Sequence, residues 1–289
     1  MKNVLKYFCF SFVLVIGSFV FCSTVQAFSI FPVRQTVVID PGKVAVASVE
    51  IYNDENKTIQ VVPEIDAFQL DPDTGHAQFG HADVAKSWIQ SNVSTITLRP
   101  KEKRVVDFTI SVPSGASRES HYLSLFLKEK SAGGQIGIGK RIGTLLFLHV
   151  SGDVSEKMQV QDFSIEKKNG KVFAHIQTHN LGNIHVVPNG EIDLFNTWGK
   201  KFASVPVNTG QRMVLPSGEW RAIVELPQVG LKNTGRIRAE LHLQYGVTNQ
   251  VIQQTMHFWY AQWSSILGVS LLILGGVLSI LFWKRNKRL

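Results

Sequence analysis

An alternation of apolar and polar side chains near the end of the chain most strongly limits what this sequence can fold into. From Arg236 to Tyr245 every second residue is apolar, namely Ile237, Ala239, Leu241, Leu243 and Tyr245. Successive side chains of a β-strand point to opposite faces of a sheet, so this period of two predicts a strand with one buried face. Shorter alternations in 104–112, 172–176 and 220–226 extend the prediction to the whole chain, which we expect to be all-β.

Turn-forming residues separate these runs and set their number. Further strand-like runs cover 30–39, 45–51, 58–70, 95–98, 121–129 and 142–150. Turns such as Asp40-Pro41-Gly42 and Pro113-Ser114-Gly115 lie between them. About seven short strands predict an immunoglobulin-like antiparallel β-sandwich over residues 28–152, and a second, membrane-proximal sandwich is expected over 153–258. Residues 72–92 are polar and predict a loop with a short helix near 82–89.

The first 27 residues have the pattern of a signal peptide. Lys2 and Lys6 precede an apolar stretch at 8–21, and Val25-Gln26-Ala27 supplies small residues for cleavage. We therefore expect removal of residues 1–27, with an uncleaved signal anchor as the alternative. Cys9 and Cys22, the chain's two cysteines, lie in this segment, so the remaining protein can form no disulfide.

The C-terminal apolar stretch predicts a membrane anchor. Residues 264–283 carry no charge, and at about 1.5 Å per residue a helix of this length crosses a hydrocarbon core roughly 30 Å thick. We predict a transmembrane helix at 259–283 and a basic cytoplasmic tail at 284–289, which makes a single-pass plasma-membrane protein in contact with the lipid bilayer. The predicted membrane-interface residues are Trp259, Tyr260, Trp263, Trp283, Lys284, Arg285, Lys287 and Arg288.

The charge distribution argues against a nucleic-acid partner. The formal net charge is +8, but two of these charges lie in residues 1–27 and four in residues 284–289, which leaves about +2 for the exported part. A nucleic-acid-binding domain would need a concentrated basic surface. The oligomeric state stays open.

The sequence contains none of the usual catalytic motifs, so we expect no enzyme and no cofactor. It lacks a G-x-S-x-G elbow and an S-x-x-K motif, which a nucleophilic serine would need. Residues 133–140 are glycine-rich, but they join two strand runs, which favours a hairpin tip over a phosphate loop.

Metal binding is also not expected. His175 and His179 share a strand face but lie roughly 13 Å apart, too far to bind one zinc ion, although a turn could bring His185 back toward them. Residues 71–81 hold part of a calcium-loop pattern without its terminal glutamate, so an Asp-Pro-Asp turn is the better interpretation.

Three tryptophans of the exported part could stack on sugars: Trp88, Trp198 and Trp220. Trp220 falls on the apolar phase of its strand and is expected in the core, and Trp88 lies in the polar segment. Trp198 stands beside Gly199 on a turn, which makes it the surface-aromatic candidate for ligand binding, with hairpin packing as the alternative.

Four segments of the first sandwich resemble a known family. They are FSIFPVRQTVVIDPGKVAVASVEIYNDENKTIQVVPEI, ITLRPKEKRVVDFTISVP, HYLSLFLKEK and GTLLFLHVSG. Their order resembles the WxL-interacting-protein peptidoglycan-binding domain family, and more distantly it is similar to the periplasmic pilus chaperones. The resemblance implies a surface protein with two immunoglobulin-like domains and a C-terminal anchor.

Two functional hypotheses follow. The first is a non-enzymatic, membrane-anchored cell-surface protein that binds a cell-wall polymer (peptidoglycan) or another surface protein through its outer sandwich. The alternative is a chaperone-like or accessory subunit for the assembly of secreted or pilus-like surface proteins. A chaperone would hold an extended client strand and lose it when an exposed sheet edge is blocked by proline.

Overall fold

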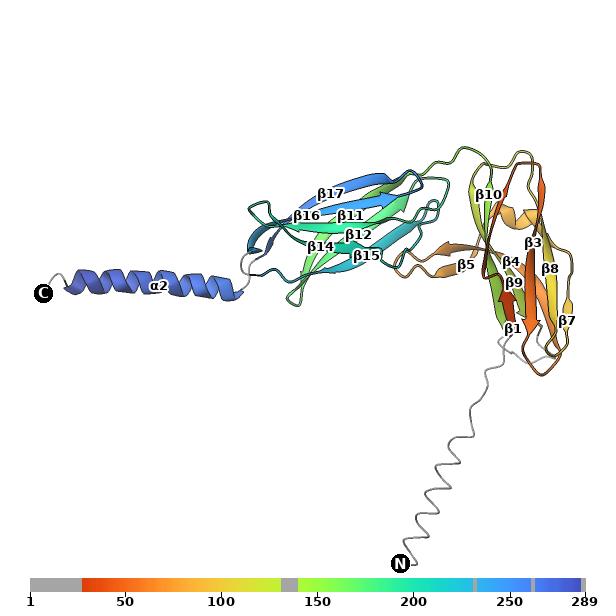
Figure 1. Cartoon of the computed structure of the whole chain (residues 1–289), viewed down its shortest axis with the longest axis horizontal. Helices are drawn as coiled ribbons and strands as arrows, with labels where there is room; N and C mark the ends of the chain where they lie inside the picture. Colours follow the sequence, from red (N-terminus) through yellow and green to blue (C-terminus); the bar gives the residue numbers. More distant parts are fainter. Residues whose placement is uncertain (1–27, 131–139, 231–232, 261–262, 287–289) are drawn as a thin grey trace, which may run out of the picture.

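The chain folds into two β-sandwiches, one after the other, followed by a helix (Figure 1). The computed structural model describes residues 28–130, 140–230, 233–260 and 263–286, so the predicted signal peptide lies outside the described residues. Most of the described chain is in strands, and its several antiparallel sheets agree with the predicted all-β, immunoglobulin-like class.

The N-terminal sandwich is formed by two sheets. Its elements are β1 (Phe28–Phe31), β2 (Arg34–Ile39), β3 (Val44–Asn53), β4 (Ile59–Leu70), β5 (Ala77–His81), the 3₁₀ helix η1 (Val84–Trp88), β6 (Ile89–Ser91), β7 (Ile96–Leu98), β8 (Lys103–Ser111), β9 (Ser120–Glu129) and β10 (Arg141–Val150). One sheet has the order β1-β3-β8-β6. The other has the order β2-β10-β9-β4-β5, with β7 paired to β4.

The predicted single run at 30–39 is divided between the two sheets. β1 pairs antiparallel with β3, whereas β2 pairs in parallel with β10. The break falls at Pro32 and Val33, where proline offers no backbone N–H for a continuous ladder. The predicted helix near 82–89 is present as η1, and the segment around it also contributes β5 and β6, which the sequence did not predict.

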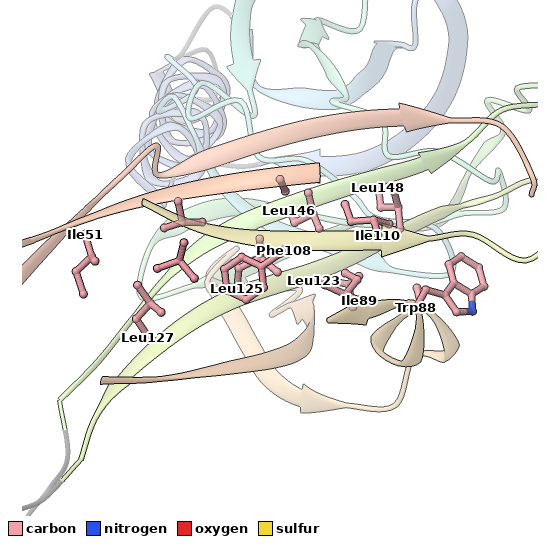
Figure 2. Close-up of a cluster of buried hydrophobic side chains, with 14 of the residues drawn as sticks. Ile51, Trp88, Ile89, Phe108, Ile110, Leu123, Leu125, Leu127, Leu146 and Leu148 are labelled. Carbon is pink, nitrogen blue, oxygen red and sulfur yellow. The ribbon is translucent and has the colours of Figure 1, made fainter. Parts of the chain in front are cut away.

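The core of the N-terminal sandwich lies between its two sheets. Figure 2 shows the labelled side chains that meet there: Ile51, Trp88, Ile89, Phe108, Ile110, Leu123, Leu125, Leu127, Leu146 and Leu148. β9 is buried on both faces, because its other side chains are covered by aromatic rings and by Arg141, whose guanidinium lies 3.8 Å from the centre of the Phe126 ring. This double burial makes β9 the structural centre of the sandwich.

The C-terminal sandwich pairs a three-stranded sheet with a four-stranded one. Its strands are β11 (Met158–Lys168), β12 (Lys171–Asn180), β13 (Asn189–Phe195), β14 (Lys201–Val207), β15 (Glu219–Leu226), β16 (Gly235–Tyr245) and β17 (Gln250–Tyr260). The sheets have the orders β11-β12-β15 and β14-β13-β16-β17, and all their pairs are antiparallel. The alternation that predicted β16 is observed: Ile237, Ala239, Leu241 and Leu243 are fully buried.

Each sandwich contains a buried asparagine that fixes a loop at the end of a strand. Asn53, at the end of β3, donates through Nδ2 to the carbonyls of Lys57, Leu98 and Arg99, and its Oδ1 accepts from the N–H of Glu55. Asn180, at the end of β12, makes the equivalent contacts in the C-terminal sandwich. Both side-chain amides are fully buried. They form hydrogen bonds with backbone groups of the loops that would otherwise have no partner, because water does not reach them.

The C-terminal membrane segment predicted from the sequence has to be corrected. Trp259 and Tyr260 belong to β17, and the helix α2 begins later, spanning Trp263–Asn286. Among the residues that the structure describes, no helix is both long enough and apolar enough to cross a bilayer. This finding contradicts the predicted single-pass localisation at a plasma membrane, and it leaves the predicted lipid contact of α2 without support.

The predicted interface residues are distributed over these elements. The Trp259 side chain is exposed on β17, and its carbonyl accepts a hydrogen bond from Lys167 Nζ. Trp263, Trp283, Lys284 and Arg285 belong to α2, whereas Lys287 and Arg288 lie outside the described residues.

We expect Asn53→Ala to lower the free energy of unfolding by about 3 kcal/mol, because three carbonyls and one N–H lose their buried partner. Urea unfolding of the full chain measures this change. Asn189→Ala, at an exposed asparagine of β13, is the matched control and should unfold as the parent does. Equal midpoints for the two variants would show that the Asn53 network contributes nothing.

Candidate functional site

The two sandwiches meet in a cluster of aromatic and imidazole rings. Tyr122 and Phe147 of the N-terminal sandwich are buried together with Leu215 of the C-terminal sandwich. The backbone N–H of His185, from the C-terminal sandwich, donates to the Tyr122 hydroxyl at 2.9 Å, and the His149 and His185 rings stack with centroids 5.9 Å apart. We call these five residues the junction cluster. It joins the sandwiches by packing and by a hydrogen bond.

Burial makes the junction cluster unfavourable for extra charge. It raises the pKa of Tyr122 to about 12, so the hydroxyl stays protonated. Burial lowers the pKa of His149. The pKa of His185 is lowered first by burial and then by His149 and by Arg34, whose guanidinium lies over the Phe147 ring. Both imidazoles are therefore held in their neutral form at neutral pH.

A second contact between the sandwiches uses the turn that connects β4 and β5. The backbone N–H and hydroxyl of Thr74 donate to the Asp71 carboxylate, and these bonds lower the pKa of Asp71. The turn therefore has the internal carboxylate cap expected of the Asp-Pro-Asp interpretation. In Figure 1 the β4–β5 hairpin reaches toward the C-terminal sandwich. There the Pro72 carbonyl accepts a hydrogen bond of 2.9 Å from the N–H of Arg221 in β15.

β15 offers an open strand edge beside this contact. In the described chain it pairs with β12 on one side, and no strand pairs with its other side. Backbone groups of a strand alternate in direction, and the Arg221 N–H points outward to Pro72. The N–H and C=O groups of Ile223 and Glu225 therefore point outward as well. The Ile223 side chain is 69% exposed.

A groove runs along this edge. It has a volume of about 760 Å³ and is lined by Asp73, by residues 206–210 and 220–225, and by Arg212. A second hollow of about 520 Å³ lies between β14 and the end of β15 and shares Glu225 with the groove. The β14 edge on the opposite wall carries Pro206, which has no N–H to donate. The groove is therefore lined by the outer edge of β15 and, at Pro206, by a position that cannot donate a backbone hydrogen bond to a partner.

The residues singled out in the sequence are not gathered in one place. His175 lies on β12 and bonds Glu166 at 2.9 Å, whereas His185 belongs to the junction cluster. In the part of the chain that the structure describes, no three His, Cys, Asp or Glu residues are placed to hold a metal ion. The glycine-rich segment 131–139 lies outside the described residues.

The three tryptophans differ in exposure. Trp220 is buried in the core of the C-terminal sandwich, as its phase predicted, and Trp88 is packed against His121. Trp198 is 87% exposed on the turn between β13 and β14, where Asn196 Oδ1 accepts from its N–H. Its part in ligand binding stays a prediction.

Sequence reasoning did not find the β15 edge. The alternation of 220–226 predicted the strand, but whether a strand lies at the edge of a sheet depends on pairing with distant residues. One local signal was present: Ile223 lies on the polar phase of its own strand, between Arg221 and Glu225.

Comparison with known proteins gives structural likeness only. The class 5 fimbriae chaperone CfaA is 10% identical, with 79% of this chain and 98% of that chain covered and a TM-score of 0.45. The CsuC–CsuE chaperone–tip adhesion subunit complex of Acinetobacter baumannii is 13% identical, covering 68% and 90%, with a TM-score of 0.37. The Salmonella enterica SafA pilin in complex with the SafB chaperone is 11% identical, covering 83% and 99%, with a TM-score of 0.38.

Pilus chaperones are thus among the similar structures, in line with the more distant of the two sequence resemblances. No family model and no curated protein matches the chain, so the resemblance to the WxL-interacting family finds no support. All three TM-scores lie below 0.5, so the likeness by itself assigns neither a function nor a site.

We expect the folded chain to lose stability as the pH falls below about 6.5, the ordinary pKa of imidazole. The lowered pKa values of His149 and His185 mean that the unfolded state binds protons first, so stability falls between pH 6.5 and the lower folded pKa values. Urea unfolding between about pH 7.5 and pH 5 measures the loss.

His185→Gln should remove part of this pH dependence, and His257→Gln, at an exposed histidine of β17, should retain it. An unchanged pH slope in His185→Gln would rule out the junction cluster as its origin.

Proposed function

We propose that the chain is a non-enzymatic, chaperone-like or accessory subunit that binds an extended segment of a secreted or pilus-like surface protein. The observation that supports this function is the outer side of β15, which has no partner strand in the described chain and lies in a groove of about 760 Å³. Each sandwich acts as a domain, over residues 28–152 and 153–258.

Strand addition is the mode of binding that suits such an edge. An added strand receives main-chain hydrogen bonds from the edge and places alternate side chains on its two faces. The outward groups of Ile223 and Glu225 offer up to four such bonds, and the exposed Ile223 side chain adds apolar contact. Binding of this kind requires no catalytic group and no cofactor.

The peptidoglycan hypothesis has less support from the site. Sugar binding by stacking needs exposed rings, and of the three tryptophans considered for it Trp88 and Trp220 are buried. Trp198 is exposed, but it stands on a turn outside the groove lining. A protein segment is therefore the partner we favour.

Ile223→Pro tests the proposed function. Proline removes an outward N–H without affecting a bond to β12, so we expect β15 to stay paired and the partner to lose main-chain contacts. Full-length chain carrying a photo-crosslinker at Glu225 should capture an exported protein in its native cells. We expect Ile223→Pro to lower this yield at least about tenfold, the effect of about 1.4 kcal/mol.

Ile223→Ala is the matched control, because it keeps the backbone N–H and removes most of the side chain. We expect it to retain most of the crosslinked product. If Ile223→Pro, folded as judged by circular dichroism, captured the same protein in the same yield, the proposed function would be wrong.

A further inference from the structure

We infer that the β15 edge selects an antiparallel strand whose C-terminal end carries an acidic side chain, with an apolar side chain beside Ile223. This inference rests on the proposed function and specifies the partner's chemistry. Three features of the groove support it. The Pro72 turn fills one pairing position at one end, Arg212 and Arg221 lie at that same end, and the Glu225 carboxylate lies at the other end.

The first feature is the Pro72 turn, which already occupies one position of the edge. Its carbonyl accepts from the N–H of Arg221, so a partner strand can pair with Ile223 and Glu225 but not beyond Arg221. The Asp71 carboxylate accepts hydrogen bonds from Asp73 and Thr74, and these bonds hold the turn in shape. The turn thus closes the groove at the Arg221 end, and a partner strand has to end or leave the edge there.

The second feature is the charge at the closed end. Arg212 donates to the backbone carbonyl of Asp73, and Arg221 NH1 lies 3.8 Å from the Asp73 carboxylate, a long ion pair whose carboxylate is 64% exposed. The side chain of Arg221 also bonds Glu219 at 2.8 Å. A carboxylate brought by the partner can compete with the Asp73 carboxylate for Arg221 and can bind the neighbouring Arg212 guanidinium, in both cases with charge-assisted hydrogen bonds.

The third feature is the opposite charge at the other end of the same edge. Glu225 lines the groove and forms an ion pair of 2.8 Å with Lys171. A partner carboxylate at this end would meet Glu225, whereas at the Arg221 end it meets two arginines. Both ends also carry compensating charges, Asp73 and Glu219 at the Arg221 end and Lys171 at the Glu225 end. The preference therefore comes from the group that a partner carboxylate directly faces, since like charges directly opposite each other are unfavourable in a sheet.

Direction follows from the sheet that the partner extends. β11, β12 and β15 are all antiparallel, and an antiparallel pair is slightly more stable than a parallel one. β15 runs from Glu219 to Leu226, so an antiparallel partner ends near Arg221. Its acidic residue comes about two positions after the residue opposite Ile223, where the partner has already left the edge beside the Pro72 turn. At about 3.3 Å per residue, the acidic side chain stays within reach of the long arginine side chains.

Three synthetic peptides test the inference by fluorescence anisotropy with the full chain. Each has about eight residues, alternates valine and threonine, and is blocked at both ends so that no terminal carboxylate contributes. The first carries aspartate next to its C-terminal end, the second has the reversed sequence, and the third has lysine in place of aspartate. We expect the first to bind at least about tenfold more tightly than the other two.

A charge-reversed variant provides the complementary measurement. Arg212→Glu should reverse the preference, so that the lysine peptide binds more tightly than the aspartate peptide. Arg236→Glu, at an exposed arginine of β16 outside the groove lining, is the matched control and should leave the preference as it is. Far-ultraviolet circular dichroism confirms that both variants fold.

Each outcome separates this inference from the proposed function. Equal affinity for the aspartate and reversed peptides, or for the aspartate and lysine peptides, overturns the inference. If no peptide binds while Ile223→Pro still loses its native partner, the acidic antiparallel segment is wrong and strand addition at β15 stands. If Ile223→Pro keeps its native partner, the proposed function fails, whatever the peptides do.

Discussion

Strand edges are the constraint on which the rest of this structure depends, because every open sheet must leave N–H and C=O groups at its two sides. The N-terminal sandwich pairs β2 in parallel with β10, and the N–H of Leu145 extends this contact by donating to the Val33 carbonyl. In the C-terminal sandwich β11 lies against β17, where Lys167 caps the Trp259 carbonyl. β14 contains Pro206, which has no backbone N–H, so one hydrogen-bond donor is missing along that strand. The β15 edge is filled at one position, where the Pro72 carbonyl accepts from the N–H of Arg221.

Local sequence predicted the strands well and their partners poorly. The alternation of 236–245 reports burial on one face, and the structure buries those residues in β16. The division of 30–39 into β1 and β2 had one local signal, Pro32, but the sheet that each half joins depends on pairing with the distant strands β3 and β10. The same reason explains the junction cluster: Tyr122 and His185 are 63 residues apart, and no spacing rule relates them.

Interpretations that used geometry along one strand were more successful than those that used composition alone. The alternation along 220–226 placed Trp220 on the apolar phase of its strand, and the structure buries it in the core of the C-terminal sandwich. The C-terminal prediction, which relied on apolar composition and interface aromatics, assigned Trp259 and Tyr260 to a helix. Both continue β17, whose register against Gly235 and Arg236 fixes them in a strand. Pairing with β16 overrode the local apolar signal.

The turn at Pro72 connects the two parts of the proposed site. It belongs to the N-terminal sandwich, yet its carbonyl fills a position on β15 of the C-terminal sandwich. The relative placement of the sandwiches therefore determines how much of the β15 edge is open. The stacked His149 and His185 rings lie at this junction, where a charge on His185 would face the His149 ring and Arg34. Separation of the sandwiches would free the Arg221 N–H and lengthen the edge by one pairing position.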